Sequence, residues 1–282
     1  MTPPAAKPEI GSAGLAELAW SIRRRVVSMA AGKGEGYVGQ GLDSAEIWAV
    51  LLGSELSYRH PPLPESDRLI LSTGHYSIGL WAALDATGHL DGYDLSTYAD
   101  DGSPLIPSTL DGDPPMVELT GGSLGHGLGV AAGLAVGRRW RGEPGRVVNV
   151  MSDGELQEGS TWEAAMFAGS EGLANLLCVV DVNRTQADGP LVLQVDPVAA
   201  KWEAFGWDAV ECDGNDVAAL LDALARLRGV RGTRPQVVLA HTELGHGAPL
   251  IAGRERRHFV RVDAHEWDRV REQVEAGHVD GA

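Results

Sequence analysis

The sequence has only two cysteines, few aromatic residues and no long apolar run. Cys178 and Cys212 are too few for a disulfide framework or a cysteine-based metal cluster, and we interpret both as free thiols in a reducing compartment. No stretch approaches the roughly 18 consecutive apolar residues of a membrane-spanning helix. The N-terminal MTPPAAKPEIGSAG also lacks the apolar core of a secretory signal. These absences predict a cytoplasmic protein that does not enter a membrane.

Basic residues are also scarce, because 23 Lys and Arg residues stand against 39 Asp and Glu residues, a formal net charge of −16. Binding to nucleic acid needs a basic surface, so this charge argues against a nucleic-acid partner. With 282 residues, of which 44% are hydrophobic, the chain can bury one large core. We find no internal repeat or linker, and therefore expect one domain over residues 1–282 that begins with a loose leader, residues 1–12.

Short apolar runs typical of β-strands alternate with stretches of helical periodicity through most of the chain. One expected helix starts with Asp43 and Ser44, which are typical of a helix cap. Since strands that alternate with helices form parallel sheets, the pattern predicts an α/β fold, a parallel sheet with helices on both faces. The expected strands lie in DRLILST, RVVNVMS, NLLCVVDV, WDAVECD and PQVVLAHT.

Two consecutive expected strands are each followed by a side chain that can bind a metal. Asp153 comes directly after the strand VVNVMS, and Asn183 lies just past the next strand, thirty residues later. Because adjacent parallel strands end at the same edge of a sheet, we expect both side chains to lie close together. A carboxylate, an amide oxygen and a nearby backbone carbonyl are hard ligands of the kind that Mg²⁺ prefers, and they leave positions for diphosphate oxygens. The sequence therefore predicts a metal–diphosphate site at this edge.

Four motifs in this order resemble the transketolase family of thiamine diphosphate-dependent enzymes. They are LILSTGHYSIGLWAAL, TGGSLGHGLGVAAGLA, DGELQEGSTWEAA and DVNRTQADG. The resemblance covers most of the chain, although Ser152 replaces the first glycine of the usual Gly-Asp-Gly. It implies the diphosphate-binding domain of that family, with thiamine diphosphate and Mg²⁺ (or Ca²⁺) as cofactors.

The resemblance also implies roles for individual residues. The metal ligands would be the side chains of Asp153 and Asn183 and the main-chain carbonyl of Thr185. Glu158 and Glu163 match acidic residues that the family places between two paired cofactor sites. The residues expected to contact the cofactor are His75, Gly122, Ser123, Leu124, Gly154, Glu155, Asn183 and His246. Those expected to take part in catalysis are Tyr37, His75, Glu158 and His246.

The chain departs from the family's pattern at two positions that concern the substrate. Tyr37 stands in EGYVG, where transketolases typically carry Ser-Gly-His-Pro-Gly, and LIPSTLDGDPP replaces a segment with Gly-His-Pro-Glu. Two histidines that would contact ketose hydroxyls are thus replaced by Tyr37 and by Ser108 or Thr109. Since tyrosine cannot act as an imidazolium near neutral pH, an ordinary sugar phosphate substrate is less favoured.

In this family a glutamate of a second, pyrimidine-binding domain activates the cofactor, and we expect that domain to be absent from this chain. The resemblance therefore implies the N-terminal subunit of a split transketolase, active with a partner subunit in an α2β2 assembly. It would transfer a two-carbon ketol unit from a ketose (phosphate) donor to an acceptor. Two alternatives stay open: a subunit that passes a two-carbon or acyl unit to a lipoyl or carrier-protein thiol, and a non-catalytic paralogue.

Overall fold

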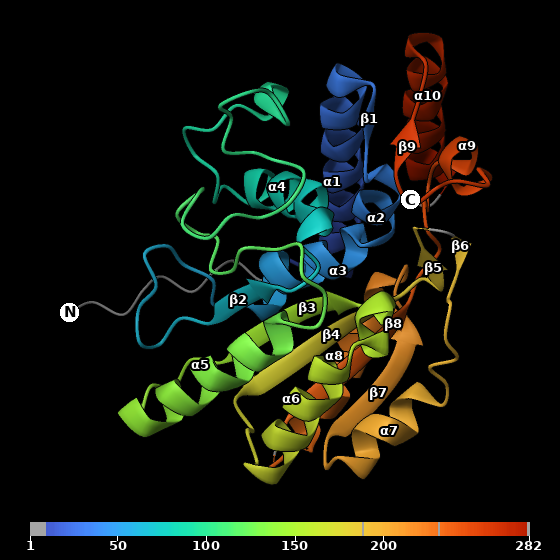
Figure 1. Ribbon diagram of the computed structural model, residues 1–282. Helices are drawn as coiled ribbons and strands as arrows, with labels where there is room; N and C mark the ends of the chain where they lie inside the picture. Colours follow the sequence, from blue (N-terminus) through green and yellow to red (C-terminus); the bar gives the residue numbers. More distant parts are fainter. Residues whose placement is uncertain (1–9, 188, 231, 281–282) are drawn as a thin grey trace.

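The fold is built on a five-stranded parallel sheet with the strand order β2-β3-β4-β8-β7 (Figure 1). The computed structural model describes residues 10–280 except 188 and 231. Each apolar run that the sequence analysis interpreted as a strand contributes one strand to this sheet, so the predicted α/β class is confirmed. The strands are β2 (Arg68–Leu71), β3 (Val147–Ser152), β4 (Leu176–Val182), β7 (Asp208–Asp213) and β8 (Gln236–His241).

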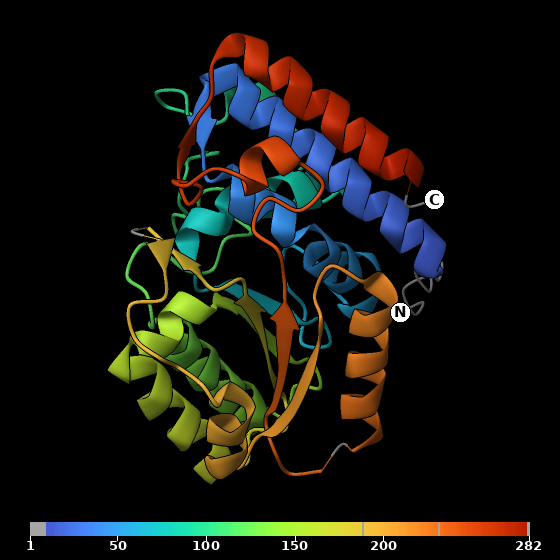
Figure 2. The same ribbon diagram turned by 90° about the vertical axis from the view of Figure 1, so that its right-hand side faces the viewer.

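Side chains of the central strand β4 alternate between two hydrophobic cores, one on each face of the sheet. Leu177 and Val179 belong to the core beneath one layer of helices, and Cys178 and Val180 belong to the core beneath the other. Figure 2 shows the sheet between these two layers. The first core is covered by α1 (Ser12–Lys33), α3 (Ala45–Val50), α4 (Ser77–Ala86) and α8 (Val217–Gly229); the second by α5 (Gly127–Arg141), α6 (Gly159–Ser170) and α7 (Val198–Ala204).

Smaller elements complete the fold around the sheet. The antiparallel pair β1 and β9 joins the two ends of the chain, and α10 packs beside α1 (Figure 2). A second antiparallel pair, β5 and β6, follows β4. The bounds are β1 (Glu35–Gly36), α2 (Val38–Asp43), β5 (Thr185–Gln186), β6 (Gly189–Pro190), α9 (Pro249–Ala252), β9 (Val260–Arg261) and α10 (Ala264–Asp280), with a π-helix at Leu51–Glu55 and 3-10 helices at Gly74–Tyr76, Leu95–Thr97 and Asp153–Gln157.

Two local predictions differ from the structure. A helix does begin after Asp43 and Ser44, and Ser44 is the N-cap residue of α3, but the expected cap differs. Asp43 ends α2, and the Ser44 hydroxyl donates to the Gln40 carbonyl at 2.5 Å instead of capping α3. Of the predicted leader, residues 1–9 lie outside the described residues, whereas Ser12 already belongs to α1.

Among the described residues no helix combines the length and apolarity needed to cross a membrane. Both cysteines are free thiols, as expected.

Candidate functional site

A cavity of about 300 Å³ lies at the edge of the sheet where β3 and β4 end. Ser152, the last residue of β3, pairs in register with Asp181 of β4, so the loops after both strands start at the same level. The loops after β3 and β4 contact two further loops, around residues 75 and 122. The cavity is lined by His75, Tyr76, Gly122, Leu124, Ser152, Gly154, Thr185, Gln186, Ala187, Val192 and His258. Several residues predicted to contact the cofactor are therefore brought together here.

The three predicted metal ligands lie together beside this cavity, where the segment that begins at Asp153 after β3 meets the turn after β4. The Asp153 carboxylate accepts a hydrogen bond from the Arg184 amide at 2.8 Å, and the Asn183 side-chain oxygen accepts one from the Thr185 amide at 3.0 Å. The turn depends on Arg184, whose φ of 58° is in the left-handed region. Burial, together with the charge of Asp181, raises the pKa of Asp153 to about 7. The raised pKa means that burial makes the charged form of Asp153 unfavourable. A cation bound by these hard oxygens would stabilise the charged form, so the donor set fits Mg²⁺.

Two glycines leave the cavity wall open to a ligand. A Cβ added to Gly154 would approach the side-chain nitrogen of Gln186 at 3.5 Å, which is ordinary contact, and one added to Gly122 would meet nothing within 4 Å. Gly122 also has a φ of 114°, which other residues rarely adopt. At both positions a bound group could approach the backbone closely, as diphosphate and an aromatic ring of a cofactor require.

His75 lies in a group of aromatic rings beside this wall. Its ring centroid is 4.8 Å from that of Tyr37 and 5.0 Å from that of His258. The His75 Nε2 atom is buried without a hydrogen-bond partner, which indicates a polar group of a ligand at this position. Burial, and then the charge of His258, lower the pKa of His75 to about 3, so the ring is neutral near pH 7. Tyr37, predicted to face the substrate, packs against His75 but is not among the residues that line the cavity, so its role stays a prediction.

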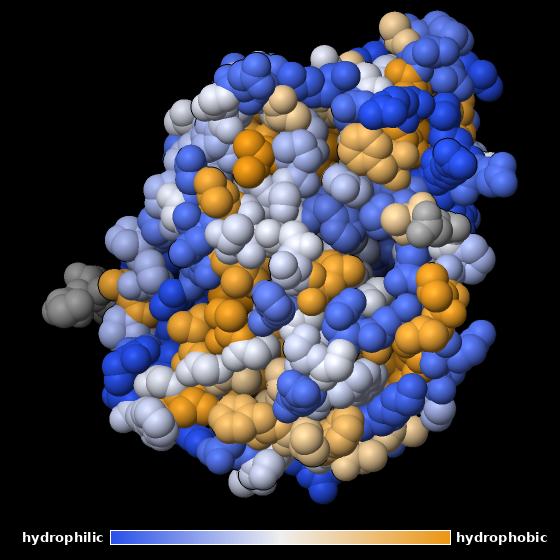
Figure 3. Space-filling view, viewed as in Figure 1, coloured by the Kyte–Doolittle hydropathy of each residue, from blue (hydrophilic) through white to orange (hydrophobic). Residues whose placement is uncertain are grey.

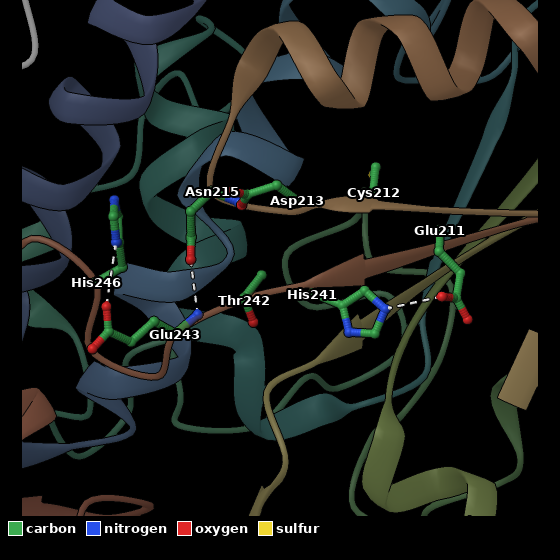
Figure 4. Close-up of a pocket in the computed structure, with 8 residues that line it drawn as sticks. All are labelled: Glu211, Cys212, Asp213, Asn215, His241, Thr242, Glu243 and His246. Carbon is green, nitrogen blue, oxygen red and sulfur yellow. Dashed lines mark hydrogen bonds and ion pairs between the residues drawn. The ribbon is translucent and has the colours of Figure 1, made fainter. Parts of the chain in front are cut away.

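His246, predicted to lie beside the cofactor, does not line this cavity, and its contact with the cofactor stays a prediction. It belongs to a larger hollow of about 590 Å³ between the ends of β7 and β8, where its ring faces Glu243 (Figure 4). Gly245 and Gly247, both with positive φ, form the turn that directs the ring there. The chain then returns through α9 and brings His258, which the sequence analysis missed, against His75. No regular periodicity surrounds His258, so it gives no sequence signal of its own.

Glu155, predicted to contact the cofactor, is not among the residues that line the cavity, and that contact stays a prediction. Its buried carboxylate instead accepts hydrogen bonds from the hydroxyls of Ser72 and Thr73, both at 2.5 Å. It also accepts from the amides of Gly125 at 2.8 Å and Ser152 at 3.2 Å. Burial raises the pKa of Glu155, and these four donors lower it in turn. Glu155 thus ties together three of the loops that form the site.

The remaining predicted residues lie beside the cavity on the surface. Ser123 is exposed between Gly122 and Leu124, which do line the cavity. Glu158 and Glu163 are exposed near the start of α6. None of these three side chains lines the cavity of the described chain, so any role they have must involve a ligand or protein outside it.

The fold is a parallel α/β domain, and its cavity lies at the carboxyl edge of the sheet. Residues 16–278 match the family described as transketolase, thiamine diphosphate binding domain. The chain belongs to the transketolase family.

Several curated relatives match nearly the whole chain. A putative uncharacterized transketolase family protein of Sinorhizobium fredii is 44% identical over 93% of this chain and 96% of its own length. An apulose-4-phosphate transketolase subunit of Actinobacillus succinogenes is 37% identical over 86% of this chain and 90% of its own length. The 6-deoxy-6-sulfo-D-fructose transketolase subunit of a Clostridium species is 32% identical, over 87% and 90% respectively.

Solved transketolase structures superpose on this chain but are longer than it. The transketolase of Campylobacter jejuni superposes with a TM-score of 0.81 at 26% identity and covers 94% of this chain. The match takes up only 45% of the Campylobacter chain, so this chain spans less than half the length of that transketolase.

Proposed function

We propose that the protein is the thiamine diphosphate- and Mg²⁺-binding subunit of a two-component transketolase-like enzyme. It would transfer a two-carbon ketol unit from a ketose (phosphate) donor to an acceptor. The observation that carries this proposal is the convergence of Asp153, Asn183 and the Thr185 segment at the end of two adjacent strands, beside the open backbone at Gly154. Two relatives, each about as long as this chain, are named as subunits of transketolases, which supports a second component.

In this proposal the chain binds and orients the cofactor. Asp153, Asn183 and the Thr185 carbonyl would hold a divalent ion, which would offset the charge of the diphosphate, and Gly154 would let the diphosphate approach the backbone. His75 would present a neutral ring toward the bound group, with the ring of His258 packed against it. Thiamine diphosphate, when bound, supplies the electron sink for breaking a bond next to a carbonyl.

The partner subunit would supply the pyrimidine-binding domain. An exposed apolar surface on α5 and α6 supports such a partner, because single soluble domains rarely expose large contiguous apolar patches. Figure 3 shows apolar side chains gathered on the face that carries α5 and α6. The exposed ones on these helices are Val130, Trp140, Met166 and Phe167. We propose an α2β2 assembly that covers this face, with Glu158 and Glu163 at its border, in a reducing compartment that fits the two free thiols.

The proposal predicts that the purified chain has no ketol-transfer activity and gains it when mixed with the pyrimidine-domain subunit encoded by a neighbouring gene. The assay would contain thiamine diphosphate and Mg²⁺, a panel of donors (xylulose 5-phosphate, fructose 6-phosphate and sedoheptulose 7-phosphate) and an aldose phosphate acceptor. The matched control is the same mixture with the Asp153→Ala chain, which should stay inactive. Transfer by the single chain, free of partner, would contradict the two-component arrangement.

Tyr37 predicts an unusual acceptor preference. In the assembled enzyme, the wild type should turn over the ordinary pair of pentose phosphates poorly, because a phenol replaces an imidazole that would pair with substrate hydroxyls. One unsatisfied buried group costs on the order of 1–3 kcal/mol, so Tyr37→His should raise kcat/KM for aldose phosphates by about 10- to 100-fold. Thiamine diphosphate affinity should stay unchanged. Equal kcat/KM for the two enzymes would show that Tyr37 does not set the acceptor.

A further inference from the structure

The side-chain amide of Asn183 is held on its nitrogen side by three oxygen atoms. Its Nδ2 atom lies 2.7 Å from Asp181 Oδ2, 2.9 Å from the Tyr76 hydroxyl and 3.1 Å from Asp43 Oδ2. The Tyr76 hydroxyl in turn donates to Asp181 Oδ2 at 2.6 Å. Since an amide nitrogen carries two N–H groups and no lone pair to accept with, it must face these oxygens. The amide oxygen then points to the opposite side, toward the Thr185 amide.

Of the three groups, Asp43 is the one that the sequence gives least reason to expect here. It lies 140 positions before Asn183, at the end of α2, a short helix whose six residues are all buried. The Asn215 side chain donates to the Asp43 carbonyl at 2.9 Å and so fixes the end of this helix. The nearby Arg23 forms an ion pair with Glu46 at 2.6 Å.

The Asp43 carboxyl group has one hydrogen-bond partner among the described residues. Its Oδ2 atom accepts from Asn183, and its Oδ1 atom is buried without a partner. Burying a carboxyl group that has no ion pair is unfavourable for folding, so a residue of this kind is usually kept for a purpose other than stability. The hydrogen bond from Asn183 suggests that Asp43 serves to orient the Asn183 side chain.

We propose that Asp43 is a positioning residue that keeps the Asn183 amide oxygen directed at the metal. This inference rests on the proposed metal site. If the amide were turned by half a rotation, its oxygen would face the oxygens of Asp43 and Asp181, and its nitrogen would face the cation. Removing Asp43 takes away one of the two carboxyl groups that disfavour the turned orientation of the amide. Partners of this kind, which orient a metal ligand, typically change metal affinity by about 10- to 100-fold.

The test measures thiamine diphosphate binding by calorimetry at graded Mg²⁺ concentrations, on the full chain assembled with its partner subunit. Asp43→Ala should raise the Mg²⁺ concentration for half-maximal binding by about tenfold or more. Asp43→Leu, which fills similar space without an acceptor, should do the same and keeps the test valid if the alanine variant fails to fold. Asp43→Asn retains an acceptor oxygen and should stay within about threefold of the wild type.

Ser44→Ala is the matched control. Ser44 is equally buried and adjacent in the chain, but its hydroxyl contacts the Gln40 carbonyl and not Asn183, so the Mg²⁺ dependence should not change. A wild-type Mg²⁺ dependence in both Asp43→Ala and Asp43→Leu would overturn the inference about Asp43. If the wild type itself bound thiamine diphosphate equally well without a divalent cation, the proposed metal site would be the part that fails.

Discussion

Asp153→Ala is expected to lower the affinity for thiamine diphosphate in Mg²⁺ by about 100-fold or more. The variant removes the one carboxylate of the proposed metal site, and loss even of a group that only supports a ligand typically costs about 10- to 100-fold in metal affinity. The fold should persist, because Asp153 lies just past the end of β3, at the start of a short 3-10 helix, and burial already disfavours its charged form. Asn183→Ala should act in the same direction. Calorimetry on the assembled enzyme measures the affinity, and the thermal midpoint of the chain without metal checks folding.

Asp196→Ala is the matched control for this experiment. Asp196 belongs to the same region and pairs with the side chain of Arg184 at 2.7 and 2.9 Å, but it is exposed and lies outside the cavity. Its removal should leave cofactor affinity within about twofold, since exposed ion pairs contribute little. Unchanged affinity in Asp153→Ala would show that the metal, if one binds, has other ligands.

Glu155→Ala is expected to destabilise the chain by about 3 kcal/mol or more. The buried carboxylate accepts from two hydroxyls and two backbone amides, and its loss leaves these donors without partners in a site that water does not reach. Because the donors belong to three separate loops, thiamine diphosphate binding should also weaken at temperatures where the variant is still folded. Urea denaturation followed by circular dichroism gives the free energy of unfolding.

Glu163→Ala serves as the comparison, because this glutamate is exposed on α6 and lies outside the cavity. It should change the free energy of unfolding by less than about 0.5 kcal/mol, as is usual for surface positions. Were Glu155→Ala as stable as Glu163→Ala, the four hydrogen bonds could not hold the loops together as the structure indicates.

The sheet could be predicted from the sequence because buried parallel strands give short apolar runs that stand out between amphipathic helices. The same pattern placed Asp153 and Asn183 at neighbouring strand ends, since parallel strands end at one edge. The caps and short helices around Asp43 were harder to predict from the sequence. A buried helix of six residues, followed directly by another, has no polar face and no periodicity that would mark its boundaries.

Parts of the site arise from packing between distant segments, and the sequence does not show them. His258 reaches His75 only after the chain has passed through a glycine-rich turn and α9. The resemblance implied that His246 contacts the cofactor, but it could not show that the ring lies near Glu243 in the hollow between β7 and β8. Glu155 lies in one of the motifs that resemble the family, and local sequence cannot tell which residues of such a loop have buried side chains.

Crystals of the assembled enzyme grown with thiamine diphosphate and Mn²⁺ in place of Mg²⁺ test the central claim most directly, through the anomalous scattering of the manganese. The account predicts one strong anomalous peak beside the cavity, bonded to a carboxylate oxygen of Asp153, the side-chain oxygen of Asn183 and the carbonyl oxygen of Thr185. The distances should lie near the roughly 2.1 Å of octahedral Mg²⁺ sites, with diphosphate oxygens completing the shell. A peak elsewhere, or a cofactor bound with its diphosphate away from Asp153 and Gly154, would contradict it.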